Sequence, residues 1–209
     1  MKQSVQNIMV IDLDRCIGCM ACQVACKLEN EVALGADRIR VLTIGPTGTY
    51  PDLQMYFLPV MCQQCEEPPC VAVCPTGASY RRTEAGDIQI DRDICIGCQS
   101  CYRACPYALN IFNNELRIMD KCDQCAHLQK IGEKPACVKN CPGRAMFFGD
   151  ANDPDSDVSR ILCETDPAHV HTLPDSGNRP MTRYILRKSD WVEIMPQEVP
   201  EPVNRRRQR

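Results

Sequence analysis

Cysteine is the residue type through which this chain could do chemistry, because thiolates bind zinc ions and iron–sulfur clusters. The chain has 17 cysteines among its 209 residues, and all but Cys163 fall into four groups of four, the quartets. The quartets are Cys16, Cys19, Cys22 and Cys26; Cys62, Cys65, Cys70 and Cys74; Cys95, Cys98, Cys101 and Cys105; and Cys122, Cys125, Cys137 and Cys141. Disulfides would instead use cysteines scattered in pairs through a small secreted domain, so the grouping favours metal ligation.

The third quartet has the most specific spacing. Two residues separate each of its first three cysteines, and the fourth, Cys105, follows after three more residues and precedes Pro106. This run resembles the ligand run of a bacterial two-cluster ferredoxin, in which the fourth cysteine binds the neighbouring cluster. Tetrahedral zinc sites also use paired cysteines, but they do not need three ligands on one turn with the fourth directed elsewhere. We therefore expect four [4Fe-4S] clusters, with a zinc-stapled binding module as the alternative.

The chain contains an internal duplication. Residues 11–22 and residues 90–101 share the pattern Ile-Asp-x-Asp-x-Cys-Ile-Gly-Cys-x-x-Cys. Residues 62–75 and residues 122–142 share a Cys-x-Gln-Cys start and a Cys-Pro end. Within the first pattern, Gly18 permits a tight turn that directs backbone N–H groups toward cluster sulfurs. The four quartets are therefore two copies of one pair of motifs.

The order of the quartets favours one assignment of ligands to clusters. The second and third quartets are joined by one short hairpin, so they should exchange their fourth cysteines, and the first and fourth quartets are left to do the same. The expected ligand sets are Cys16, Cys19, Cys22 and Cys141 for cluster 1; Cys122, Cys125, Cys137 and Cys26 for cluster 2; Cys62, Cys65, Cys70 and Cys105 for cluster 3; and Cys95, Cys98, Cys101 and Cys74 for cluster 4. A rival assignment, which follows the duplication, pairs the first quartet with the second and the third with the fourth.

Short strands, turns and helices must position these ligands. A helix over residues 20–32 would place Cys22 and Cys26 one turn apart on one face. Residues 45–51 predict a Gly/Pro turn, and residues 150–182, rich in Asp, Pro, Ser and Gly, predict a loop held by its contacts. The expected strands are 5–12, 39–44, 55–61 and 182–187, and residues 142–150 predict a strand followed by a turn.

The expected fold class is α+β, with two nested ferredoxin-like units and insertions. Unit A would comprise residues 1–30 plus 106–150, and unit B would comprise residues 62–105. Residues 31–61 would be an insertion between the cluster motifs, and residues 151–209 would be a C-terminal extension that contacts a partner. One unit would thus lie within the sequence of the other.

Charge and composition exclude several functions. The formal net charge is −3, and four oxidised clusters, at about −2 each with their thiolates, would bring it to about −11. Nucleic acid is therefore not an expected partner, although the chain ends in the basic tail Arg205–Arg209. The sequence shows no Ser/His/Asp constellation, no paired catalytic carboxylates and no Gly-rich phosphate loop, so we expect no active site in this chain.

The sequence also suggests a location. The N-terminus shows no apolar segment and no twin arginine of an export signal. No window holds 18 uninterrupted apolar residues, as a transmembrane helix would require. We expect the protein in the cytoplasm, or exported in folded form together with a partner that carries the signal.

Two single residues fall outside these patterns. Cys163 lies outside the quartets, and we expect it to be a half-buried small apolar side chain. Trp191 is the one tryptophan of the chain. We expect it to be an anchor against the domain or a partner rather than an electron relay.

Several motifs together resemble a known family over residues 5–160. They are Cys-Ile-Gly-Cys at 16–19, Ala-Cys-Lys at 25–27, Cys-Pro-Thr-Gly-Ala at 74–78, Cys-Pro-Tyr at 105–107 and the run from Phe148 to Ser159. The chain resembles the four-cluster electron-transfer (beta) subunits of the dimethyl sulfoxide reductase superfamily of molybdenum and tungsten bis-pterin oxidoreductases. Some members have tryptophan in place of one cysteine of the third quartet and hold a three-iron cluster, whereas that quartet is intact here.

The resemblance implies a function. The chain would relay single electrons through four [4Fe-4S] clusters between an external donor or acceptor and the molybdenum or tungsten pterin site of a catalytic partner subunit. A membrane anchor subunit or a soluble electron carrier would be the second partner, in anaerobic respiration. The alternatives are a free-standing polyferredoxin and the electron-transfer subunit of a hydrogenase.

Overall fold

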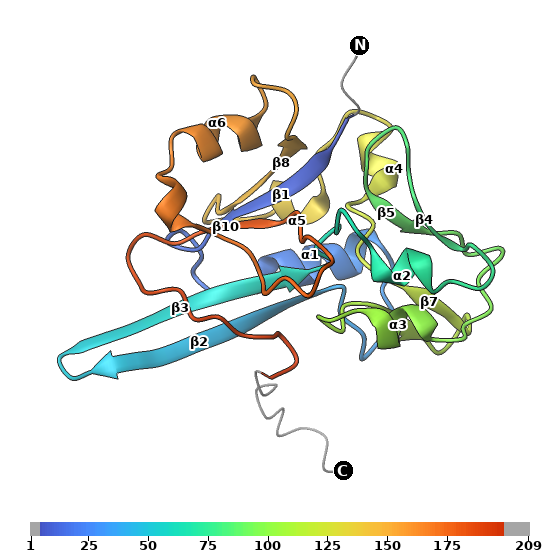
Figure 1. The fold of residues 1–209 in the computed structure, drawn as a ribbon, viewed down its shortest axis with the longest axis horizontal. Helices are drawn as coiled ribbons and strands as arrows, with labels where there is room; N and C mark the ends of the chain where they lie inside the picture. Colours follow the sequence, from blue (N-terminus) through green and yellow to red (C-terminus); the bar gives the residue numbers. More distant parts are fainter. Residues whose placement is uncertain (1–4, 199–209) are drawn as a thin grey trace.

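The computed structural model describes residues 5–198 (Figure 1). The basic tail Arg205–Arg209 lies outside the described residues. Short helices alternate with small sheets along the chain, as expected for an α+β protein. The described part contains no helix that is long and apolar enough to cross a lipid bilayer.

A four-stranded sheet in the order β8-β1-β10-β9 forms the centre of the fold. Its strands are β1 (Asn7–Asp12), β8 (Met146–Asp150), β9 (Val170–His171) and β10 (Arg183–Ile185). β1 pairs antiparallel with β8 and parallel with β10. Both faces of β1 are buried, because Met9 and Ile11 belong to the main core while Ile8 and Val10 pack against Val158. A strand covered on both faces needs no polar alternation, which explains its continuous apolar run.

A long antiparallel arm projects from the body of the protein (Figure 1). The arm consists of β2 (Ile39–Thr49) and β3 (Asp52–Met61). The turn predicted over residues 45–51 is confined to residues 50–51, because the ladder resumes at Thr47 after a register shift and continues to Thr49. A register shift after Ile44 accommodates Pro46, which has no N–H to donate to a regular ladder.

The remaining short elements surround the cysteines and form two pairs of contacting helices. Helix α1 contacts α5, and helix α2 contacts α3. The helices are α1 (Ala21–Glu29), α2 (Pro69–Ala72), α3 (Ser100–Ala104), α4 (Ala126–Gln129) and α5 (Ala136–Lys139). Two small hairpins complete this part, namely β4 (Ser79–Arg81) with β5 (Ile88–Ile90) and β6 (Ile111–Asn113) with β7 (Ile118–Asp120).

Residues 150–182 are more regular than the predicted loop. They contain helix α6 (Asp157–Cys163), the 3-10 turn η1 (Pro167–His169) and β9. The Ser156 hydroxyl caps α6 by accepting the Ser159 N–H at 3.2 Å, and the buried Val158 attaches the helix to β1. Cys163 is exposed at the end of α6, so the prediction of a half-buried side chain is wrong.

The chain after β10 crosses to the arm. Trp191 stacks on His171, with ring centroids 4.8 Å apart, and on Tyr56, with centroids 6.3 Å apart. The Val192 N–H donates to the Tyr56 hydroxyl at 3.1 Å. Trp191 therefore anchors the C-terminal segment against the domain itself.

Arg38 connects the start of the arm to the last cysteine quartet. It is buried (4% exposed) and forms a bidentate ion pair with Asp120 at 2.7 and 3.0 Å. Its third nitrogen donates to Asp123 and Asn30, both at 3.0 Å. A buried carboxylate without this cation would be unfavourable, so Arg38 fixes β2 against the segment that carries the fourth quartet.

We expect Arg38→Met to destabilise the holoprotein by about 3–5 kcal/mol, because it leaves Asp120 without its buried partner. Arg92→Met is the matched control, since the exposed Arg92 approaches the same carboxylate only to 3.9 Å and such surface pairs contribute less than about 1 kcal/mol. Denaturant-induced unfolding under anaerobic conditions measures both variants. Equal midpoints would contradict the role given to Arg38.

Candidate metal centres

Each quartet begins just after a strand and reaches into a short helix. The first quartet follows β1, the second follows β3, the third follows β5 and the fourth follows β7. Helices α1, α2, α3 and α5 carry the buried Cys22, Cys70, Cys101 and Cys137. In this strand–loop–helix arrangement the first two cysteines of a quartet lie before the helix, and the last one lies in the helix (Cys26) or just after its end (Cys74, Cys105 and Cys141).

Two cysteines of the quartets are exposed, and they occupy equivalent places in the internal repeat. They are Cys19 of the first quartet and Cys98 of the third. Beside them, Ile17 and Ile96 are each 65% exposed. The duplication therefore produces two similar surfaces, each with an exposed thiol next to an exposed aliphatic side chain.

The loops of the first and third quartets have the same backbone conformation. Gly18 and Gly97 have φ angles of 66° and 65°, and Met20 and Gln99 have φ angles of 60° and 61°. Left-handed residues turn successive N–H groups toward one side, which suits an anionic cluster. A Cβ on Gly97 would lie 2.2 Å from the Arg117 carbonyl oxygen, so no larger residue fits there without a shift.

We expect Gly97→Ala to lower the iron content by about one cluster per chain, because alanine at this position meets a steric clash as well as the roughly 1–2 kcal/mol of a left-handed backbone. Gly77→Ala is the control, since Gly77 also has a positive φ (71°) but a Cβ there meets nothing within 4 Å. Iron analysis of both variants, isolated anaerobically, measures the difference. If both retain the same iron, the close approach at Gly97 does not control cluster binding.

The first and fourth quartets lie together. Asn30 Nδ2 is 3.7 Å from Cys26 Sγ and 3.6 Å from Cys125 Sγ. Burial, and then the charges of neighbouring thiolates that include Cys141, raise the pKa of Cys22 to about 11. Thiols of the first and fourth quartets therefore lie close together beside α1 and α5.

The second and third quartets also lie together. Burial, and then the charges of neighbours that include Cys105, raise the pKa of Cys65 to about 12. A small cavity is lined by cysteines of both quartets, namely Cys74, Cys95, Cys98 and Cys101. Each of these quartets thus contributes its last cysteine to the neighbourhood of the other.

Several sulfurs accept backbone N–H groups. The bonds run to Cys74 from Ser79 (3.3 Å), to Cys141 from Ala145 (3.3 Å) and to Cys95 from Met119 (3.4 Å). Donors of this kind stabilise a thiolate, and they raise the reduction potential of a cluster because they offset the charge of an added electron.

Sequence reasoning missed two side-chain donors. Asn178 Nδ2 lies 3.0 Å from Cys65 Sγ, and Lys121 Nζ lies 3.6 Å from Cys62 Sγ. Burial lowers the pKa of Lys121, but the charges of the surrounding cysteines, Cys62 first, more than offset this and raise it. Asn178 is far along the chain from every quartet and gives no signal in the sequence, whereas Lys121 directly precedes Cys122 and could have been noticed.

The environment of the thiols fits iron–sulfur clusters. Burial raises the pKa of Cys26 and of Cys65 to about 12, so a metal is needed to keep these sulfurs deprotonated at neutral pH. An all-cysteine donor set surrounded by N–H groups is the environment of a [4Fe-4S] cluster. Within residues 5–198, no three His, Cys, Asp or Glu side chains are grouped as ligands of a single metal ion.

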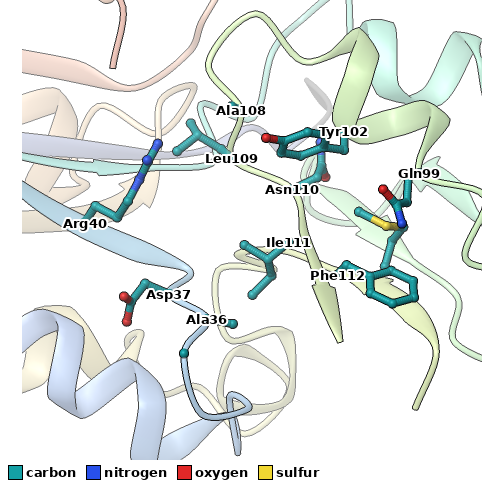
Figure 2. A pocket seen from close by; sticks show the side chains of 12 residues that line it. Ala36, Asp37, Arg40, Gln99, Tyr102, Ala108, Leu109, Asn110, Ile111 and Phe112 are labelled. Atoms are coloured by element: carbon teal, nitrogen blue, oxygen red, sulfur yellow. The ribbon is translucent and has the colours of Figure 1, made fainter. Parts of the chain in front are cut away.

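A groove of about 440 Å³ lies beside the third quartet, but none of its lining residues is a cysteine (Figure 2). Asp37 and Arg40 bound it on the side of the arm, and Tyr102, Asn110 and Phe112 bound it on the side of α3 and β6. Two buried side-chain atoms, Asn110 Oδ1 and Arg40 Nη2, have no hydrogen-bond partner in the part of the chain that is described. The groove therefore contains no cysteine, although Gln99 from the loop of the third quartet is one of its lining residues.

Comparison with known protein families gives two matches. Residues 53–151 and residues 15–78 each match a 4Fe-4S dicluster domain. The two ranges overlap, and together they include all four quartets. The chain is therefore an iron–sulfur protein with ferredoxin-like dicluster domains, and its cysteine content fits four [4Fe-4S] clusters.

Individual relatives define the family. The chain is 40% identical over 206 residues to a Halobacterium salinarum protein assigned as the iron–sulfur subunit of a dimethyl sulfoxide reductase, with 85% of this chain and 78% of the relative covered. It is 37% identical to a sulfite dehydrogenase subunit of Allochromatium vinosum (93% and 88% covered) and 46% identical to a thiosulfate reductase electron transfer subunit of Salmonella typhi (69% and 76% covered). The chain belongs to the iron–sulfur electron-transfer (beta) subunits of the dimethyl sulfoxide reductase superfamily, which confirms the resemblance seen in its motifs.

Proposed function

We propose that this chain carries single electrons along a row of four [4Fe-4S] clusters between an external donor or acceptor and the molybdenum or tungsten bis-pterin centre of a catalytic partner subunit. A membrane anchor subunit or a soluble carrier is the proposed partner at the other end. The observation that carries the proposal is the pairing of the quartets into two groups, each with one exposed ligand, Cys19 or Cys98. Electrons enter and leave most readily where a cluster approaches the surface.

The protein itself positions the clusters and adjusts their potentials, while the clusters supply the one-electron chemistry. The surroundings of the thiols differ. Cys65 Sγ accepts a hydrogen bond from the side-chain amide of Asn178, whereas Cys141 Sγ accepts one from the backbone N–H of Ala145. Exposure differs as well, because Cys137 is buried whereas Cys19 is exposed. Potentials follow such hydrogen bonds and exposure, so each cluster should have a potential of its own.

Metal analysis of the native complex tests the proposed function. We expect about sixteen iron atoms per chain, accompanied by about one molybdenum or tungsten, when the complex is isolated anaerobically and measured by mass spectrometry. Nickel in place of molybdenum or tungsten would indicate a hydrogenase subunit, and iron alone would indicate a free-standing polyferredoxin. Zinc in place of iron would contradict electron transfer by this chain.

We also propose the nested assignment of ligands, in which the second and third quartets exchange their fourth cysteines and the first and fourth quartets do the same. The contacts of α1 with α5 and of α2 with α3 support it. The position of Asn30, close to both Cys26 and Cys125, supports it as well. Under the rival assignment, Cys26 would complete the cluster of the second quartet.

The variant Cys26→Ser separates the two assignments. Nesting predicts that it changes the same electron paramagnetic resonance (EPR) signal as Cys122→Ser and leaves the signal altered by Cys62→Ser intact. The physical reason is that a cluster with a weaker fourth ligand changes its potential or loses an iron. If Cys26→Ser instead changes the same signal as Cys62→Ser, the rival assignment is correct.

A further inference from the structure

Lys121 is a buried lysine between two of the quartets. It lies between β7 and Cys122 and is 2% exposed. Its ammonium group donates to the carbonyl oxygens of Ile88 and of Cys122, the latter at 2.9 Å, and lies 3.6 Å from Cys62 Sγ. One cation therefore touches the second quartet through a sulfur and the fourth quartet through the backbone of its first ligand.

A buried ammonium requires negative charge nearby, because its transfer out of water is unfavourable by several kcal/mol. No carboxylate contacts the ammonium group directly, since none of the ion pairs found within residues 5–198 includes Lys121. Asp120 and Asp123, its neighbours in sequence, are instead paired with Arg38. The charges that act most strongly on Lys121 are those of the Cys62, Cys70 and Cys122 sulfurs, with a smaller contribution from Asp123.

We propose that Lys121 is the common countercharge of two iron–sulfur clusters, the one bound by Cys62 and the one bound by Cys122. The proposal deepens the proposed function and rests on it for the presence of the clusters. It does not depend on the assignment of the fourth ligands, because Cys62 and Cys122 belong to different clusters under the nested and the rival assignment alike.

The physical consequence concerns two neighbouring reduced clusters. Each one-electron transfer oxidises one cluster and reduces the next, and the charge of a cluster with its four thiolates changes from about −2 to about −3 on reduction. A cation between the clusters stabilises the added charge on either side and weakens the repulsion between them. Lys121 therefore raises the reduction potentials of both clusters. It also lets one of the two clusters accept an electron while the other is already reduced.

Removal of the charge tests this role. In Lys121→Met holo-complex we expect two EPR signals to titrate at more negative potentials, while the other two signals keep theirs. Cys62→Ser and Cys122→Ser identify which signals these are. Lys121→Arg, which keeps the charge, should lie closer to the wild type, and Lys130→Met, at an exposed lysine, should shift no signal.

The same experiment excludes a purely structural role. If Lys121 only held the two carbonyl groups, Lys121→Met would reduce stability without a selective change in potential. Unchanged potentials, or equal shifts of all four signals, would overturn the proposal. Lys121→Gln serves as a second neutral variant, since its amide can still donate to a carbonyl oxygen.

A measurement on the wild-type complex tests the same proposal without relying on variants that must fold. Lysine labelled with ¹⁵N at Nζ should give a ¹⁵N hyperfine coupling in the reduced cluster that Cys62 binds, detected by electron–nuclear double resonance. A complex with [4Fe-4S] signals but no such coupling would overturn the role of Lys121 alone. A complex without [4Fe-4S] signals would overturn the proposed function as well.

Discussion

A buried thiolate is stable only where a metal, a cation or N–H dipoles offset its charge, and this requirement accounts for much of the structure. The helices that carry cysteines of the quartets are short, and each follows a loop that contains residues with a left-handed backbone conformation. The two buried cations Arg38 and Lys121 lie beside the fourth quartet. The main core also includes cysteines such as Cys22 and Cys137, so the apolar interior and the cluster sites are built from the same elements.

Much of the candidate site could be predicted, because it is specified by residues that lie close together in the sequence. Spacing alone identifies the four quartets, and the repeated Cys-Ile-Gly-Cys predicts the left-handed glycines Gly18 and Gly97. The strands near residues 7–12 and 183–185 follow from short apolar runs bounded by polar residues. Backbone conformation at a glycine and the formation of a short strand depend on residues that are neighbours in the sequence. A local pattern is therefore enough to predict these features.

The features that could not be predicted depend on contacts between distant segments. The arm is longer than expected because the register shift lets the ladder pass Pro46, and a Gly-Pro pair normally indicates a turn. Helix α6 forms in a polar stretch because Ser156 caps it and Val158 finds a buried site on β1. Asn178 reaches Cys65 from 113 residues away, a distance at which no local pattern gives information.

The parallel pairing of β1 with β10 joins a strand that is synthesised early to one that is synthesised late. Val10 in β1 pairs with Arg183 in β10. In the sequence, every cysteine of the quartets lies between these two strands, at residues 16–141. A ribosome therefore makes all sixteen cysteines of the quartets before it makes β10, which completes the central sheet, and Asn178, which donates to Cys65. The nascent chain can therefore complete this sheet only after the last cysteine of the quartets, Cys141, has been synthesised.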